Sequence, residues 1–162
     1  MAGPPMQIHI DENAKTIACH KAAPVPIHWD EKHKEDLDRD VAMEVIEPTP
    51  IGEPVTWCHR MVLTRKTDGT PRRVVDYTHL NKYCKRETHT VESPMVIARR
   101  VPRETWKTVT DLWHGFHQIP IAEEDSHYTT FMTKTGRYRY KRVPQGFIAS
   151  GDALNNLSLI HI

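Results

Sequence analysis

The sequence predicts an α+β fold in which antiparallel β-hairpins predominate and helices are few. Two observations carry this prediction. Two pairs of segments alternate between apolar and polar residues as β-strands do, and turn-forming residues join the members of each pair. Helical spacing is confined to two stretches, and no internal repeat is visible.

The first predicted hairpin joins residues 55–64 to residues 72–77. Its turn contains Asp68-Gly69, a strong signal for a tight reversal of the chain. The period of two places one set of side chains on a common face of the first strand: Val55, Trp57, His59, Met61 and Leu63.

The second predicted hairpin joins residues 127–133 to residues 137–143 through Lys134-Thr135-Gly136. Residues 143–147 (VPQGF) close it, with Gln145 able to donate and accept hydrogen bonds and Gly146 able to admit a close neighbour. A plain turn explains this segment equally well. The small residues that follow are suited to the start of a helix.

The helical pattern is clearest in residues 29–46, where Leu37, Val41 and Val45 form one apolar stripe. Three prolines in residues 47–54 end this helix and predict an exposed crossing. A short helix is expected at residues 95–100, whereas residues 78–94 look mostly irregular before it. The Pro- and Ala-rich residues 1–26 look like a linker or an extended arm.

The composition is that of one domain with a modest core, or of a part of a larger protein, because the 162 residues are only 38% hydrophobic. A net charge of +1 means that any nucleic-acid surface needs local clustering of cations. The three cysteines are far apart and indicate free thiols in a reducing compartment. The eleven histidines show no zinc-finger spacing, and no signal peptide or membrane span is visible, so we expect a soluble intracellular protein.

Four cations lie around the first turn: Arg65, Lys66, Arg72 and Arg73. A two-stranded finger with guanidinium and ammonium groups at its tip can grip a polyphosphate through charge-assisted hydrogen bonds. The alternative is an ordinary solvated turn. Asp111, at the end of a short β-type run in TVTDLWHGFHQIPI, is equally ambiguous, because an aspartate there can simply cap a turn.

Taken together, these motifs and their order resemble the reverse transcriptase of LTR retrotransposons, closest to the gypsy type, and through it the retroviral enzymes. The succession is the basic finger, RRVVDYTHLN, TVTDLWHGFHQIPI and YTTFMT followed by GRYRYKRVPQGF, within residues 23–154. The resemblance implies a fingers region at residues 27–93 and part of a palm at residues 94–154.

The resemblance implies a role for four residues around Asp111. Asp111 matches the palm aspartate that binds the catalytic Mg²⁺ ions, for which carboxylates are suitable hard ligands. The backbone N–H groups of Leu112 and Trp113 match those near the triphosphate. Phe116 matches the aromatic residue that lies against the sugar and leaves no room for a 2′-hydroxyl, so that deoxynucleotides are selected.

The resemblance also assigns the fingertip cations. Arg72 and one of Arg65 or Lys66, with a preference for Arg65, match residues that bind the phosphates of the nucleotide. Gln145 matches the residue that steadies the nucleotide and the template, although many gypsy-type elements carry Phe there. We expect Asp76 to form a structural ion pair in the fingers, and residues 123–125 to be a solvated acidic helix start.

The third palm motif of this family, a hydrophobic residue before Asp-Asp, does not occur in the sequence. One carboxylate cannot hold two Mg²⁺ ions about 4 Å apart. We therefore expect a fragment of an RNA-directed DNA polymerase that is itself inactive. The alternative is a domesticated, non-catalytic module that binds nucleic acid or protein.

The implied partners of the intact enzyme are an RNA or DNA template with its primer, deoxynucleoside triphosphates and the rest of the Pol polyprotein, without a membrane. The implied location is the cytoplasm, in the virus-like particle of the element, with the nucleus as the alternative. Residues 155–162 are expected to be a non-native tail. From Leu157 the letters LSLIHI are a translation of CTG TCT CTT ATA CAC ATC, the mosaic-end adaptor of transposase-made sequencing libraries.

Overall fold

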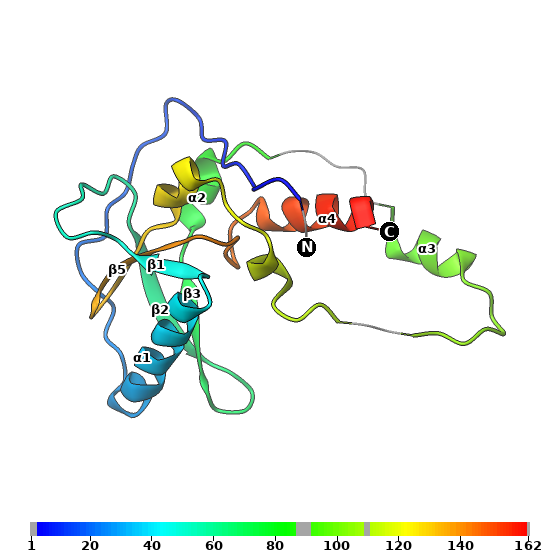
Figure 1. The fold of residues 1–162 in the computed structure, drawn as a ribbon, viewed down its shortest axis with the longest axis horizontal. Coiled ribbons are helices and arrows are strands. Elements are labelled where there is room, and N and C mark those ends of the chain that lie inside the picture. Colours follow the sequence, from blue (N-terminus) through cyan, green and yellow to red (C-terminus); the bar gives the residue numbers. More distant parts are fainter. Residues whose placement is uncertain (1–2, 87–91, 109–110, 162) are drawn as a thin grey trace.

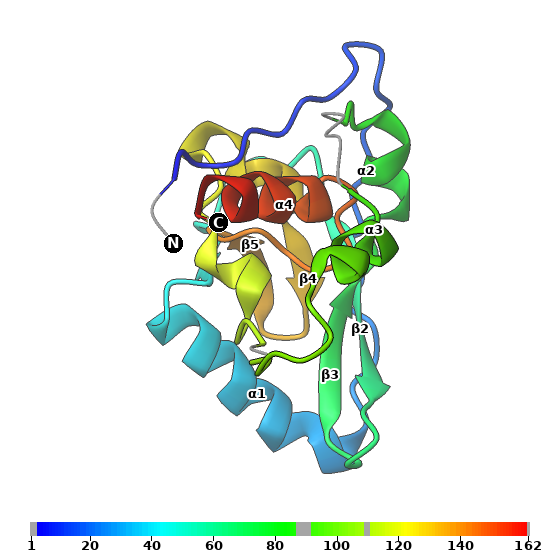
Figure 2. The same ribbon diagram turned by 90° about the vertical axis from the view of Figure 1, so that its right-hand side faces the viewer.

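The computed structural model describes residues 3–86, 92–108 and 111–161, and it confirms the α+β prediction. Five strands form one sheet in the order β1-β5-β4-β2-β3. Helices flank this sheet, as Figures 1 and 2 show. The strands are β1 (Ile46–Pro48), β2 (His59–Arg65), β3 (Pro71–Val75), β4 (Phe131–Thr133) and β5 (Gly136–Tyr140). The α-helices are α1 (Ile27–Ala42), α2 (Thr78–Tyr83), α3 (Pro94–Arg100) and α4 (Ser150–His161).

The first hairpin is confirmed, with β2 and β3 antiparallel and Met61 opposite Val75. Its strand begins at His59 rather than at residue 55. Trp57, His59 and Met61 of the predicted face are all buried, but Cys58 between them is buried as well, so the alternation holds only from His59 onward. At the turn, Gly69 has a φ of 85°, and Asp68 Oδ1 accepts hydrogen bonds from the N–H and the hydroxyl of Thr70.

The second hairpin is confirmed only in part. Strands β4 and β5 pair antiparallel, with Thr133 opposite Gly136, but residues 127–129, predicted as strand, belong to the 3-10 helix η2 (Glu123–Thr129). The reason is local hydrogen bonding by hydroxyl groups. Ser126 and Thr129 each donate to the carbonyl oxygen three residues earlier, at 2.9 and 2.7 Å, which favours a helical turn over a strand.

The prediction for residues 29–54 was wrong at the end of the helix. Helix α1 ends at Ala42, and Glu44 takes a positive φ of 53° that turns the chain back. Ile46, which is 1% exposed, then pairs with Tyr140, so the expected exposed crossing begins as an edge strand, β1. Leu37 and Val45 of the predicted stripe do face the core.

Residues 78–94 are also more regular than predicted, because α2 occupies residues 78–83. Asp76 Oδ1 accepts a hydrogen bond from the Thr78 N–H at 2.9 Å and so supports the helix start. Hydrogen bonding by Thr78, first through its side chain and then through its backbone N–H, lowers the pKa of Asp76. The ion pair predicted for Asp76 is not among those of the described residues. Part of this segment, residues 87–91, lies outside the described residues.

The N-terminal arm is extended, as predicted, but it is tied to the body of the protein. Residues 6, 10 and 18 form bridges with Ile121, Cys84 and Cys58. Ile8 is buried, and its N–H donates to Asp125 Oδ2 at 2.8 Å. Asp125 therefore holds the arm, which corrects the expectation that residues 123–125 are merely solvated.

The short helix predicted at residues 95–100 is confirmed as α3. Residues 92–108, which include helix α3, extend away from the sheet (Figure 1). Helix α4 continues through His161. The prediction that residues 157–162 are adaptor-derived stays a prediction, because their side chains and all of Ile162 lie outside the described residues. In the described part of the chain, no helix is long and apolar enough to cross a membrane.

Two buried histidines make the stability of this fold depend on pH. His33 and His59 are each 2% exposed, and burial lowers the pKa of both imidazoles. Because the folded protein holds them neutral, their stabilising contribution is complete above the ordinary histidine pKa. It is lost as the pH falls through that value toward their lowered pKa, where the unfolded chain takes up protons first.

We therefore expect the free energy of unfolding to fall between pH 7.5 and pH 5, by up to about 1.4 kcal/mol per pH unit for each histidine. Urea unfolding at several pH values measures this slope. His33→Leu should reduce the slope, because it removes one of the two buried groups that titrate. It also removes Nε2, a buried atom with no hydrogen-bond partner among the described residues. His20→Gln, at an exposed position, is the control and should leave the slope unchanged. An equal slope in His33→Leu and the unmodified chain would contradict the assignment.

Candidate functional site

A cavity of about 440 Å³ opens between α1, the β2–β3 hairpin and the segment around Gln145. Three of the predicted nucleotide-binding residues, Lys66, Arg72 and Gln145, line it together. Gln145 lies 73 residues after Arg72, so its approach to the two hairpin cations is a result of the tertiary fold. Its other lining residues with ionisable side chains are Asp36, Arg39, Asp40, Arg73, His114, His117 and Tyr140.

Arg72 and Gln145 are in direct contact across the cavity. Arg72 Nη2 donates to Gln145 Oε1 at 2.5 Å. Gln145 is held in place by its neighbours: Ser150 Oγ donates to the Pro144 carbonyl at 2.7 Å, and Gly146 takes a φ of 89° that favours glycine. The turn predicted at residues 143–147 thus presents its amide side chain to the fingertip.

The two candidate cations at the start of the turn separate. Lys66 lines the cavity. The Arg65 guanidinium instead lies at the tip of the turn, where a Cβ at Gly69 would stand 3.6 Å from Nη2. Period-two alternation also favours this separation, because adjacent residues at the end of a strand point in different directions. The geometry therefore favours Lys66 over Arg65 as a partner for an anion.

Asp111, Leu112 and Trp113 are not part of this cavity as described. All three are exposed, Trp113 by 71%. The β-type run predicted before Asp111 falls partly on residues 109–110, outside the described residues, and Thr108 and Asp111 themselves are in coil. A strand needs a neighbour for its backbone hydrogen bonds, and no described pairing includes this segment.

Phe116 lies in the 3-10 helix η1 (Gly115–Gln118), half-buried against the hydrophobic core. It does not line the cavity, although its neighbour His117 does. A Cβ on Gly115 would stand 2.9 Å from Leu112 Cδ2, the end of an exposed side chain that can move aside. The structure thus places Phe116 beside the site, on its core side.

His114 and His117 also line the cavity, although the sequence pattern assigned no role to either of them. Their rings stack at 5.5 Å with an interplanar angle of 14°. His114 has a positive φ of 48°, a strained conformation that often occurs at functional sites. Burial lowers the pKa of His117, so this ring is held neutral.

The electrostatic character of the cavity suits an anion. Its lining brings the cations Arg39, Lys66, Arg72 and Arg73 together with only two carboxylates. Both carboxylates belong to α1 and already bind Arg39, through Asp36 at 2.8 Å and Asp40 at 3.2 Å. Lys66 and Arg72 form no ion pair in the described part of the chain, which leaves them available to phosphate oxygens.

A metal centre is not assembled here. Among the residues that the structure describes, no three His, Cys, Asp or Glu side chains gather in a way that could hold a metal ion. Asp111 is an exposed single carboxylate, and Mg²⁺ bound by a lone carboxylate would depend on other ligands. The described residues therefore do not fit the two-ion site that the sequence resemblance implies.

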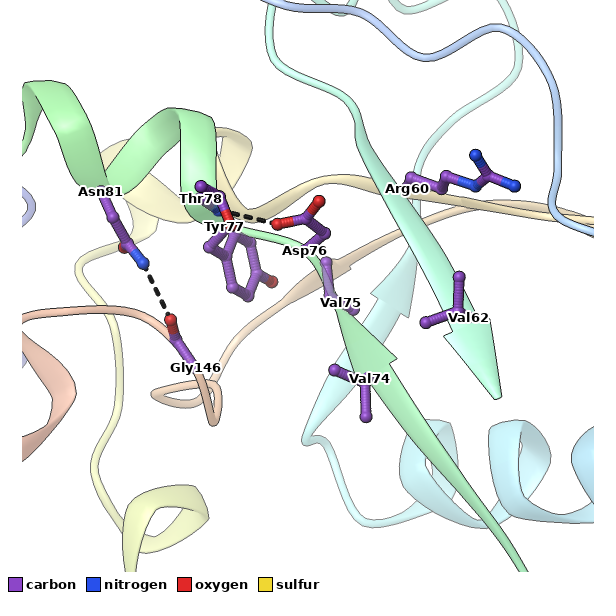
Figure 3. A pocket seen from close by; sticks show the side chains of 9 residues that line it. All are labelled: Arg60, Val62, Val74, Val75, Asp76, Tyr77, Thr78, Asn81 and Gly146. Carbon is purple, nitrogen blue, oxygen red and sulfur yellow. Dashed lines mark hydrogen bonds between the residues drawn. The ribbon is translucent and has the colours of Figure 1, made fainter. Parts of the chain in front are cut away.

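A second cavity, of about 520 Å³, is lined by β2, β3 and the start of α2 (Figure 3). Val62 and Val74 form an apolar surface, and Arg60, Asp76 and Thr78 add polar groups. Asn81 joins α2 to the segment after Gln145: its Nδ2 donates to the Gly146 carbonyl at 3.0 Å, and its Oδ1 accepts from the Ile148 N–H at 2.9 Å. Both cavities are lined by Gly146 and by Val74 and Val75 of β3.

Comparisons with known proteins agree with this geometry. A family model described as "Reverse transcriptase (RNA-dependent DNA polymerase)" matches residues 64–157, more than half of the chain. The Pol polyprotein of transposon opus from Drosophila melanogaster is 27% identical over 87% of this chain. That of transposon 297 from the same organism is 33% identical over 60%. The chain covers 14% and 9% of these relatives, so it spans about a tenth of their length.

Solved structures show the same fold. Native prototype foamy virus protease-reverse transcriptase matches with a TM-score of 0.75 at 23% identity, over 94% of this chain and 21% of that one. The foamy viral enzyme in complex with an RNA/DNA hybrid matches with a TM-score of 0.73 at 19% identity, over 94% and 21%. The family match, the gathering of the fingertip cations with Gln145 and the shared fold lead to one conclusion: the chain belongs to the reverse transcriptase family of RNA-directed DNA polymerases.

Proposed function

We propose that the chain forms the nucleotide-binding part of an RNA-directed DNA polymerase that adds deoxynucleotides to a primer 3′ end. The observation that carries this proposal is the single cavity in which Lys66, Arg72 and Gln145 meet. Two cations supply charge-assisted hydrogen bonds to a triphosphate, and an amide side chain can both donate and accept beside it. The reaction itself places most of the work on such positioning and charge stabilisation.

The proposed metal ligand is Asp111, acting with further carboxylates that the described residues do not bring to it. The ions would be Mg²⁺, which prefers carboxylate oxygens. Without those carboxylates we expect the 162-residue chain to bind nucleotide but to extend no primer. Extension by this chain alone, above a no-enzyme control, would contradict the two-ion assignment.

The proposed partners of the whole polymerase are deoxynucleoside triphosphates and a primed RNA or DNA template. The foamy viral relatives of known structure include complexes with double-stranded DNA and with an RNA/DNA hybrid. In this chain the second cavity offers a suitable surface for a template strand, with an apolar surface at Val62 and Val74 and a cation at Arg60. A domesticated binding module remains the competing proposal if nucleic acid binds and nucleotide does not.

The first test measures the affinity of the chain for a fluorescent deoxynucleoside triphosphate. Lys66→Ala and Arg72→Ala should each weaken binding by about tenfold, since a charge-assisted hydrogen bond contributes roughly 1.5–3 kcal/mol before solvent screening reduces it. Arg65→Ala is the matched control, because Arg65 carries the same type of charge outside the cavity, and it should bind nearly as the unmodified chain does. Equal losses in all three variants would indicate non-specific attraction by the turn.

The role of Asp111 is testable in a polymerase that contains this chain together with a complete palm. Asp111→Asn keeps the size of the side chain and removes the charge that a metal ion needs. We expect primer extension to fall by more than 100-fold while the affinity for primed template stays within about twofold. Asp125→Asn, remote from the cavity, serves as the control. Retention of a tenth of the unmodified turnover would overturn the assignment of Asp111.

The role of Phe116 is testable in the same polymerase by comparing the kcat/KM values for a deoxynucleotide and the matching ribonucleotide. Phe116→Val opens space beside the sugar, so the preference for the deoxynucleotide should fall at least tenfold. Phe116→Tyr keeps the ring and should preserve the preference. If Phe116→Val lowers stability and leaves the preference unchanged, Phe116 is only a core residue, as its half-buried position permits.

A further inference from the structure

Arg72 and Arg73 are neighbours in β3, but they point to opposite faces of the hairpin. Arg72 is paired in register with Thr64, whereas Arg73 is paired with Leu63, which packs against the core. Side chains alternate along a strand, so one arginine reaches the cavity mouth while the other is directed inward. Only the first of the two has an assigned role in the proposed nucleotide site.

The Arg73 guanidinium is buried where three elements meet. Its side chain is 9% exposed, and Nη2 donates to Asp40 Oδ2 of α1 at 2.6 Å. The same guanidinium lies over the rings of Phe131 in β4, at 5.5 Å, and Tyr140 in β5, at 5.8 Å. Burial alone would lower the pKa of Arg73, but Tyr140 and Asp40 beside it raise the pKa above its ordinary value, so the group stays charged.

The contacts of Arg73 help to hold β3 in place, because β3 is the edge strand of the sheet. Backbone hydrogen bonds hold β3 to β2 alone, while its free side faces the cavity. Through Arg73 the edge strand is also connected to α1 and to the middle of the sheet. Figure 2 shows α1 running beside the hairpin. The hairpin is therefore held to the rest of the sheet in two ways, by the pairing of β2 with β4 and by the buried Arg73 cation on β3.

Burying the Arg73–Asp40 ion pair also has a cost in free energy. Arg73 Nε is buried and has no hydrogen-bond partner among the residues that the structure describes, and a buried ion pair often stabilises no more than apolar residues of the same volume would. An ion pair that adds little stability can still fix one arrangement of the groups around it, and here that arrangement sets the position of β3. The adjacent residue is Arg72, whose 2.5 Å hydrogen bond to Gln145 depends on where β3 lies.

We propose that Arg73 is a positioning residue for the nucleotide site: clamped by Asp40, Phe131 and Tyr140, it holds β3 so that Arg72 meets Gln145. This proposal rests on the proposed nucleotide-binding function. It requires arginine in particular, because a planar guanidinium can lie over two rings while it donates to a carboxylate. A lysine ammonium keeps the charge but lacks the plane and the fork.

The test is a double-mutant cycle in the 162-residue chain, read as affinity for a fluorescent deoxynucleoside triphosphate. Arg73→Lys should weaken binding by about fivefold. Since Arg73 acts through Arg72, Arg73→Lys should cause no further loss when Arg72→Ala is already present. An equal loss in both backgrounds, or no loss in either, would overturn the proposal.

Two variants separate positioning from a general loss of structure. Arg139→Lys is the matched control, because Arg139 also forms close ion pairs, with Glu47 at 2.6 Å and Glu53 at 3.0 Å, away from the cavity. It should change the unfolding midpoint and leave nucleotide affinity within twofold. Asp40→Asn removes the partner of Arg73 with little change in size, and it should reproduce the loss seen in Arg73→Lys. If Arg139→Lys weakened binding as much, Arg73 would have no special role.

A second readout does not involve nucleotide. The side-chain amide NMR signal of Gln145, assigned with Gln145→Glu, should move when Arg72→Ala removes its partner, and Arg73→Lys should move it in the same direction. An unmoved signal would overturn the positioning role even if binding were weakened. Failure of the unmodified chain to bind any nucleotide would instead overturn the proposed function, and the signal would still decide whether Arg73 positions Arg72.

Discussion

The fold depends on a short parallel pairing between β2 and β4, in which His59 lies opposite Phe131 and Arg60 opposite Met132. This pairing joins two hairpins into one sheet, although the paired residues His59 and Phe131 are 72 positions apart in the sequence. It is supported by burial: Phe131 is 0% exposed, and the His59 ring contacts Tyr77 and the Tyr128 carbonyl. Because burial lowers the pKa of His59, its ring is held neutral there, and no imidazolium charge is buried at the junction.

The candidate site follows from this junction. Joining the hairpins brings the basic tip of the first beside the turn that ends the second, so that Arg72 contacts Gln145. Helix α1 closes the same cavity with Asp36 and Asp40, which bind arginines and leave Lys66 and Arg72 without carboxylate partners among the described residues. A chain of nearly neutral net charge thus obtains a locally cationic cavity through the distribution of its ion pairs.

Sequence patterns correctly predicted the features that depend on residues close together in the sequence. The Asp68-Gly69 turn, the alternation from His59 onward, and the helix at residues 94–100 all depend on neighbours within a few residues. The errors arose where local signals compete. Alternation suggested a strand at residues 127–129, but hydroxyl groups of Ser126 and Thr129 bond locally to favour a 3-10 helix. The apolar stripe continued through Val45, although the helix had ended at Ala42.

The sequence by itself determined the family and the α+β class and placed four cations around the first turn, because ordered motifs and turn chemistry are written in consecutive residues. Only the tertiary structure decided which cations share a cavity: Lys66 lines it and Arg65 does not, and Arg73 is buried against Asp40. It also showed that Asp111 and Phe116 lie outside that cavity in the described structure. The physical reason is that cavities and buried ion pairs are made by residues distant in sequence, and their contacts depend on the packing of whole elements.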